Sequence, residues 1–195
     1  MTLINDGTGK GNNAKVDGNN RLHTQSVQES EATHAVEAGD AYNINSGNIT
    51  FSAAGTLLFL QNNEDKDLVI SALAIGLGSG TLSDSAEITV ERNTTGGDLG
   101  FSDNTAVDIN ANRNFGSSKT LSADVYKGKS GGTSTGGNDA VLFYQTASSR
   151  LFASIDIVVP KGNNIAITID PKLSSGSIKA YAAIICHLKD PNSKD

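Results

Sequence analysis

The chain has 195 residues, enough for one domain with a short appendage, and its formal charge at pH 7 is −6. Hydrophobic residues make up 37% of the sequence, which suffices for a buried core, and 21 glycines favour a fold rich in turns. Lysines and arginines are scattered singly, so the sequence offers no basic stripe for direct binding of nucleic acid.

Two further classes are excluded by the distribution of apolar residues. The longest apolar run, Ala180–Cys186, has seven residues, whereas a membrane-spanning helix needs roughly 20. The sequence therefore predicts no contact with a membrane. Residues 1–10 contain neither a basic start nor an apolar stretch, so we expect no secretory signal and synthesis in a cytoplasm. Cys186 is the single cysteine and is predicted to be an inert, buried thiol.

Residues 1–39 are poorer in apolar side chains than the rest and are predicted to form an extended N-terminal arm. Clusters of Gly, Asn and Asp favour turns, and short extended pieces lie between and after them. Such a segment buries too little surface to fold alone, so we expect it to lie against the body, a sister subunit or another partner. The arm residues predicted to bind a partner are Val16, Arg21, Leu22 and Val27.

Residues 40–190 are predicted to form an all-β domain, followed by a C-terminal tail at 191–195. Short runs rich in Ile, Val, Leu, Thr and aromatic residues alternate with polar turns. A single stretch, Gln28–Ala38, has passable helix propensity. The predicted strands are Ala41–Phe51, Thr56–Gln61, Asp67–Leu77, Ala86–Arg92, Ala106–Ile109, Thr120–Tyr126, Ala140–Thr146, Arg150–Val159, Asn164–Asp170 and Ile178–Leu188.

Ten strands in one domain indicate a β-sandwich or a barrel. In Ala86–Arg92, apolar and polar residues alternate, which predicts one buried and one exposed face. Leu57–Leu60 and Ala180–Cys186 are apolar on both faces, which is typical of central strands covered on both sides. Val158–Ile165 has Pro and Gly at turn positions and predicts two consecutive antiparallel strands.

No set of residues suited to catalysis is found in the sequence. His23 and His34 fall in the arm and His187 ends the last predicted strand, so no nucleophile–base–acid set is predicted. Glu87 and Glu91 share a strand face, and we interpret them as a solvated edge rather than as paired catalytic carboxylates. We therefore expect a protein that is not an enzyme.

One loop carries enough oxygen ligands to be considered for calcium. Asn62–Asp67 contains several carboxylates but lacks the spacing and the glycine of an EF-hand loop. A tight turn between two strands explains the same residues, and we favour it, so no metal or other cofactor is expected. The weak calcium candidates are Glu64, Asp65 and Asp67.

Four segments resemble virion structural proteins of tailed bacteriophages, namely Ala14–Leu22, Gly39–Gly47, Asn62–Asp67 and Val107–Gly116. The resemblance runs over most of the chain and carries no catalytic motif. It implies a jelly-roll-like antiparallel β-sandwich that assembles as a homotrimer and attaches to a shell or tail through an arm or through one end of the sandwich. The implied location is the virion.

The resemblance leaves two roles open. The first is a capsid decoration or auxiliary protein that binds the major capsid protein, or another virion protein, on the outside of the head. The second is a tail, baseplate or head-fibre component that binds a host receptor or glycan through polar loops such as Asn93–Thr105. For a glycan, an exposed aromatic ring is expected to stack on the sugar, and the candidates are Phe101 and Phe115.

Overall fold

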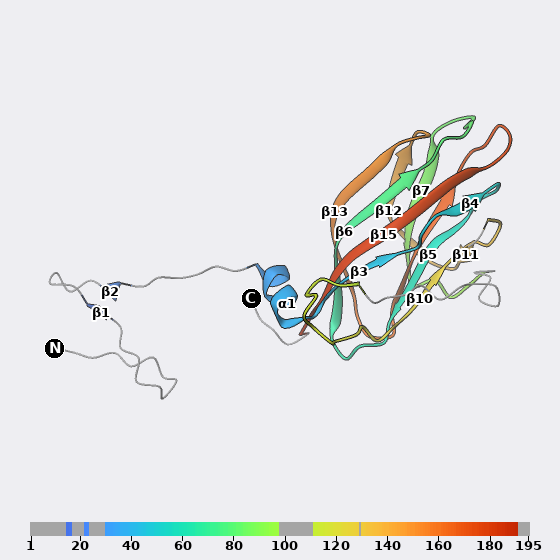
Figure 1. Cartoon of the computed structure of the whole chain (residues 1–195). Helices are drawn as coiled ribbons and strands as arrows, with labels where there is room; N and C mark the ends of the chain where they lie inside the picture. Colours follow the sequence, from blue (N-terminus) through green and yellow to red (C-terminus); the bar gives the residue numbers. More distant parts are fainter. Residues whose placement is uncertain (1–14, 17–21, 24–29, 98–110, 129, 191–195) are drawn as a thin grey trace. The chain divides into compact units, whose positions relative to one another are not determined.

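The computed structural model describes residues 15–16, 22–23, 30–97, 111–128 and 130–190 (Figure 1). Its chain divides into two compact units, Met1–Ser30 and Glu31–Asp195. In the first unit, β1 (Lys15–Val16) pairs antiparallel with β2 (Leu22–His23). The boundaries that the sequence predicts, with an arm at 1–39, a sandwich at 40–190 and a tail at 191–195, remain predictions. No helix among the described residues is long and apolar enough to cross a membrane.

One layer of the second unit is a six-stranded antiparallel sheet. In sheet order its strands are β13 (Arg150–Val159), β6 (Asp67–Leu77), β15 (Ile178–Lys189), β3 (Ala41–Asn45) and β9 (Ala111–Asn112), with β4 (Ile49–Phe51) also pairing with β15. β15 is central, and β13 and β9 form the two edges. The apolar run that the sequence predicts to be central therefore lies in the middle of this sheet.

The other layer is a five-stranded sheet. In sheet order its strands are β10 (Ala123–Lys127), β5 (Gly55–Asn62), β14 (Asn164–Asp170), β7 (Ala86–Arg92) and β12 (Asn138–Gln145). β12 forms one edge and β10 the other. A further pair, β8 (Gly96–Gly97) with β11 (Ser134–Thr135), lies outside the two layers.

The connectivity of the two layers is that of a jelly roll. Apart from β7 and β12, which pair with each other, successive strands of this set of eight switch sheets, so that β3, β6, β13 and β15 fall in one layer and β5, β7, β12 and β14 in the other. The spatial orders β3-β15-β6-β13 and β5-β14-β7-β12 are those of two interleaved Greek keys. The predicted fold class, an all-β jelly-roll sandwich, is confirmed, and β10 is an additional edge strand.

The core lies between the two sheets and is built from alternate residues of each strand. Leu73 and Ile75 of β6 and Ile184 of β15 are fully buried, as are Ile88 and Val90 of β7. Every second residue of these strands points away from the core. The predicted alternation in β7 is thus confirmed, because Ile88 and Val90 face the core while their neighbours do not.

A short helix, α1 (Glu31–Ala38), packs against β15 and β3, and Ala35 is its buried residue. The helix ends in a Schellman motif, in which the N–H groups of Gly39 and Asp40 donate to the carbonyls of Val36 and Ala35 at 3.0 and 2.7 Å. Gly39 has φ of 76°, and a Cβ there would lie 2.2 Å from the Ser117 hydroxyl oxygen. This position therefore requires glycine.

Two predicted features are wrong in detail. The predicted strand Ala41–Phe51 is two strands, β3 and β4, because Gly47 takes φ of 66° and its N–H donates to the Asn45 side chain at 2.8 Å. β13 and β14 are consecutive but do not pair with each other, since the turn between them crosses from one sheet to the other. The predicted strand Ala106–Ile109 lies outside the described residues.

The crossing turn after β13 is held by Asn62 at the end of β5. The buried Asn62 side chain donates to the Val159 carbonyl at 2.8 Å. The Asn62 N–H donates to the Asn163 carbonyl at 3.0 Å, and the Gly162 N–H donates to the Asn62 carbonyl at 2.7 Å. These bonds tie the turn to the opposite sheet, so a hairpin-like sequence forms a corner of the sandwich.

Candidate functional site: an apolar face and an open edge

The most unusual surface of the sandwich is its edge at β13. Along this strand, exposed and half-buried residues alternate from Arg150 to Val158. Phe152 and Val158 are 64% and 53% exposed, which is high for large apolar side chains in a strand. β12, the edge strand of the other layer, adds Leu142 and Tyr144, 46% and 64% exposed. We call the side of the sandwich formed by β12 and β13 the open edge.

The open edge continues onto the outward side of the six-stranded sheet. The strand registers align outward side chains in rows across β13, β6, β15 and β3. The rows are Arg150–Gly76–Tyr181, Phe152–Ala74–Ala183–Asn45, Ser154–Ala72–Ile185–Asn43 and Val158–Val69–His187–Ala41. We call this surface the apolar face, because its formal charges in these rows are confined to the edge strand. A contiguous apolar surface of this kind is typical of an interaction site.

Close packing of small residues makes the apolar face flat. Gly76 lies directly opposite Tyr181 in the pairing of β6 with β15. A Cβ at Gly76 would lie 2.1 Å from Cε1 of Tyr181, so the ring lies on the bare backbone of β6. Ala74 and Ala183 continue the flat surface in the next row.

Helix α1 covers the end of the apolar face that carries His187. His187 is only 5% exposed, and its Nδ1 lies 3.2 Å from the hydroxyl oxygen of Ser71. Burial lowers the pKa of His187 below its usual 6.5, although Glu31 of α1 acts in the opposite direction. Glu31 also accepts a hydrogen bond from Lys189 at 3.1 Å, which fastens the helix to β15.

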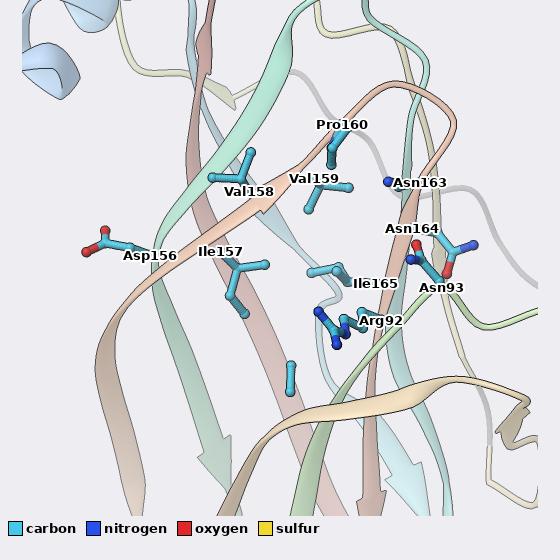
Figure 2. Close-up of a pocket in the computed structure, with 11 residues that line it drawn as sticks. Arg92, Asn93, Asp156, Ile157, Val158, Val159, Pro160, Asn163, Asn164 and Ile165 are labelled. Atoms are coloured by element: carbon cyan, nitrogen blue, oxygen red, sulfur yellow. The ribbon is translucent and has the colours of Figure 1, made fainter. Parts of the chain in front are cut away.

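A cavity of about 390 Å³ lies at one end of the open edge (Figure 2). Ile157, Val159 and Ile165 supply apolar lining, and Arg92 and Asn164 supply polar groups. In Figure 2 the carboxylate of Asp156 points away from the other labelled side chains. Among the labelled groups, the cavity is therefore lined by the guanidinium of Arg92 and by asparagine amides, and no carboxylate points into it.

Ser71 and His187 are a hydroxyl and an imidazole in contact, which is the first requirement for a nucleophile–base pair. Within the described residues, no carboxylate is hydrogen-bonded to the ring, and neither residue lines the cavity of Figure 2. His187 is also almost inaccessible. This pair therefore joins β6 to β15 and offers no approach for a substrate.

Cys186 is fully buried, with its Sγ 3.6 Å from the Tyr42 carbonyl oxygen, and burial raises the pKa of the thiol to about 12. The thiolate is the reactive form of cysteine, so this group is inert near neutral pH. The predicted buried thiol is confirmed.

The predicted partner-binding residues of the arm are described only in part. Val16 lies opposite Leu22 in the pairing of β1 with β2, so the structure brings these two together. Arg21 and Val27 lie outside the described residues. Partner binding through these four residues stays a prediction.

Only one of the two candidates for glycan binding lies among the described residues. Phe101 lies outside the described residues, whereas Phe115 is 99% exposed in the loop after β9. The Asn114 side chain fixes this loop by accepting the Gly116 N–H at 3.0 Å and donating to the Glu37 carbonyl at 3.0 Å. Phe115 is therefore a bare ring on a hydrogen-bonded turn.

Two of the three calcium candidates, Glu64 and Asp65, have protein partners. Glu64 accepts the Ser122 N–H at 2.6 Å, and Asp65 forms an ion pair with Lys161. Asp67 is the first residue of β6. In the parts of the chain that the structure describes, no group of three His, Cys, Asp or Glu side chains is placed to hold a metal ion. The turn between β5 and β6 explains these residues.

The residues of the open edge were not among the sequence-based candidates. The signal was present, since Arg150–Val159 is apolar at odd positions and carries Phe152 and Val158 at even positions. A strand that is apolar on both sides reads as a central strand. Only the sheet order places β13 at an edge.

A comparison of the sequence with protein-family models finds no match, and neither does a comparison with curated proteins.

Proposed function

We propose that this protein is a non-enzymatic structural subunit of a virion, an auxiliary capsid protein that binds the outside of a tailed-phage head. Its N-terminal arm attaches it to the major capsid protein or to another virion protein. The sandwich contributes contacts between subunits. The observation that supports an assembly role most directly is the apolar face with its open edge, where Phe152 and Val158 are exposed.

The proposed mechanism is linkage between binding and stability. Contacts that exist only on the assembled shell stabilise the shell against the state in which they are absent. An arm that orders along a partner uses part of its binding free energy for this ordering, so it binds through many small contacts spread over a large surface. The division of the chain at residue 30 is consistent with an arm that is separate from the sandwich.

Deletion of residues 1–30 tests the proposal. Full-length and truncated proteins are added to phage heads that lack this protein, and binding is measured by co-sedimentation. We expect the truncated protein to lose binding by at least tenfold while its melting temperature stays within a few degrees of the full-length value. Equal binding of a folded, truncated protein would refute attachment through the arm.

Point variants refine the same experiment. Val16→Asp and Leu22→Asp place charges at the paired positions of β1 and β2, and Lys15→Asp is the matched control at the neighbouring position. We expect the first two variants to reduce binding to heads more than the control does.

The alternative role is a tail, baseplate or head-fibre component that binds a host glycan. The exposure of Phe115 on a fixed turn favours it, because an aromatic ring at 99% exposure is available to stack on a sugar. A glycan array distinguishes the two roles. Specific glycan binding that is lost in Phe115→Ala, together with no binding to heads, would replace the capsid proposal with this one.

A further inference from the structure

β13 has one paired edge and one unpaired edge. Eight of its ten residues pair with β6 on one side, and in the described part of the chain no strand lies on the other. An unpaired edge presents free N–H and C=O groups to which a second strand can add. Natural edge strands commonly carry bulges or charges against such pairing. β13 has an irregular register between Ser154 and Ile157, and two charged residues, Arg150 and Asp156.

These two charges are placed symmetrically on the strand. Both side chains are exposed, both belong to the outward set of alternating residues, and neither forms an ion pair with any residue that the structure describes. Arg150 lies three residues before Ala153 and Asp156 three residues after it. When two copies of β13 lie antiparallel with Ala153 opposite Ala153, the charges of one copy are therefore complementary to those of the other.

We infer that β13 is the contact through which two copies of this chain associate, strand against antiparallel strand, about a two-fold axis at Ala153. In this register Arg150 of each copy lies opposite Asp156 of the other. Phe152 lies opposite Ser154, which leaves room for the ring. On the inward side, Leu151 lies opposite Ile155, and Ala153 lies opposite its own counterpart, where a small residue permits close approach.

Neighbouring registers lack this complementarity. A shift by two residues places Phe152 opposite Phe152 or opposite Asp156, and Arg150 opposite Ser154 or Val158. Both charges then lose their partners. A shift by one residue sets the outward residues of one copy opposite the inward residues of the other, so that the apolar faces of the two copies would lie on opposite sides. Opposite charges at facing positions stabilise a strand pair, and like charges destabilise it.

The contact would join the two six-stranded sheets into one continuous sheet and the two apolar faces into one surface. A two-fold contact uses the same surface on both subunits and produces even-numbered assemblies. A homotrimer would need a different contact, and pairing through β13 would then join trimers two by two. This inference does not depend on the virion proposal, because the contact is tested on the isolated protein.

Charge reversal of the full-length chain tests the inference, with the dissociation constant measured by sedimentation equilibrium. Arg150→Glu places a like charge opposite Asp156 at both symmetric positions, and Asp156→Arg does the same opposite Arg150. We expect each single variant to raise the dissociation constant roughly tenfold. The double variant Arg150→Glu/Asp156→Arg restores both opposite-charge pairs and should return the constant to within about threefold of the original.

Matched controls lie at the opposite edges of the two sheets. Arg113→Glu, directly after β9, and Asp124→Arg, in β10, reverse exposed charges away from β13 and should leave association unchanged. Monomers at all concentrations, an odd-numbered assembly, or folded single variants with unchanged association would overturn the inference. So would a folded double variant that fails to restore association.

Discussion

The outer faces of the two sheets differ in chemistry although both belong to one sandwich. Along the rows of the five-stranded sheet, acidic side chains recur on several strands. They are Glu87 and Glu91 of β7, Asp170 of β14, Asp139 of β12 and Asp124 of β10. The four rows that define the apolar face hold mostly Ala, Gly, Val, Ile, Phe and Tyr. Their polar members are Asn43, Asn45, Ser154 and His187, and their one formal charge is Arg150 of β13. We call the outer face of the five-stranded sheet the acidic face.

The difference indicates which surface is adapted to water. On the acidic face, Glu91 accepts hydrogen bonds from the hydroxyls of Ser134 and Thr168 at 2.7 and 3.2 Å, and Lys172 pairs with Asp170. These groups need no further partner to be stable in solvent. On the apolar face, polar contacts lie at the end under α1, where Ser71 meets His187 and Lys189 donates to Glu31. Burying the rest of this face against another subunit would remove apolar surface from water. The inner faces of the two sheets are both apolar because they pack against each other in one core.

The largest expected effect comes from breaking the flatness of the apolar face. In Gly76→Ala the new Cβ meets the Tyr181 ring, which must move away from β6. We expect the free energy of unfolding to fall by roughly 1–3 kcal/mol, as is usual for overpacked sites. Urea denaturation measures this change. On the acidic face, Thr89→Ala removes a half-buried hydroxyl and should change stability by about 0.5 kcal/mol or less.

The cause of that effect can be isolated with a second substitution. In a Tyr181→Ala background the ring is absent, so Gly76→Ala should cost far less there than in the original chain. Additive effects of the two substitutions would show that the contact between ring and backbone does not shape this face.

Variants of the two strands of the open edge, β12 and β13, test association rather than stability. Phe152→Lys on β13 and Leu142→Lys on β12 each replace an exposed apolar residue by a cation. Because Phe152 belongs to the apolar face and Leu142 to the acidic one, we expect the first to raise the dissociation constant of the association proposed through β13 about tenfold. The second should change it less than threefold. Equal effects of both variants in sedimentation equilibrium would mean that the two faces contribute alike.

Much of the fold could be predicted from local patterns, because alternation and turn residues act over a few positions. The predicted bounds of β7 and β14 are those that the structure gives, since the apolar and polar residues of these strands alternate. The sheet to which a strand belongs is not a local property. β13 and β14 are joined by a tight turn and yet lie in different sheets, because Asn62, about 100 residues away in sequence, holds the turn.

The candidate surface was less predictable than the fold for the same reason. Val69, Ala74, Ile185 and Phe152 come from three strands far apart in sequence, and only the registers align them. Phe115, by contrast, was a candidate from the sequence alone, since its loop is marked by Asn and Gly, and it is fully exposed. Loop residues can be proposed from local sequence, whereas a sheet face requires the topology.

The smallest expected effect concerns pH and the covered end of the apolar face. Burial lowers the pKa of His187 in the folded chain below its value of 6.5 in the unfolded chain. As pH falls below about 6.5, the unfolded chain gains a proton that the folded chain does not, so the free energy of unfolding decreases. The stability conferred by the neutral ring is complete above that pH and is lost as pH approaches the folded pKa.

Urea denaturation between pH 7.5 and 5 measures this decline, and His187→Gln should flatten it. His34→Gln, at an exposed position of α1, is the matched control and should leave the decline in place. A decline that persists in His187→Gln would mean that another titrating group causes it and that the buried ring of His187 does not.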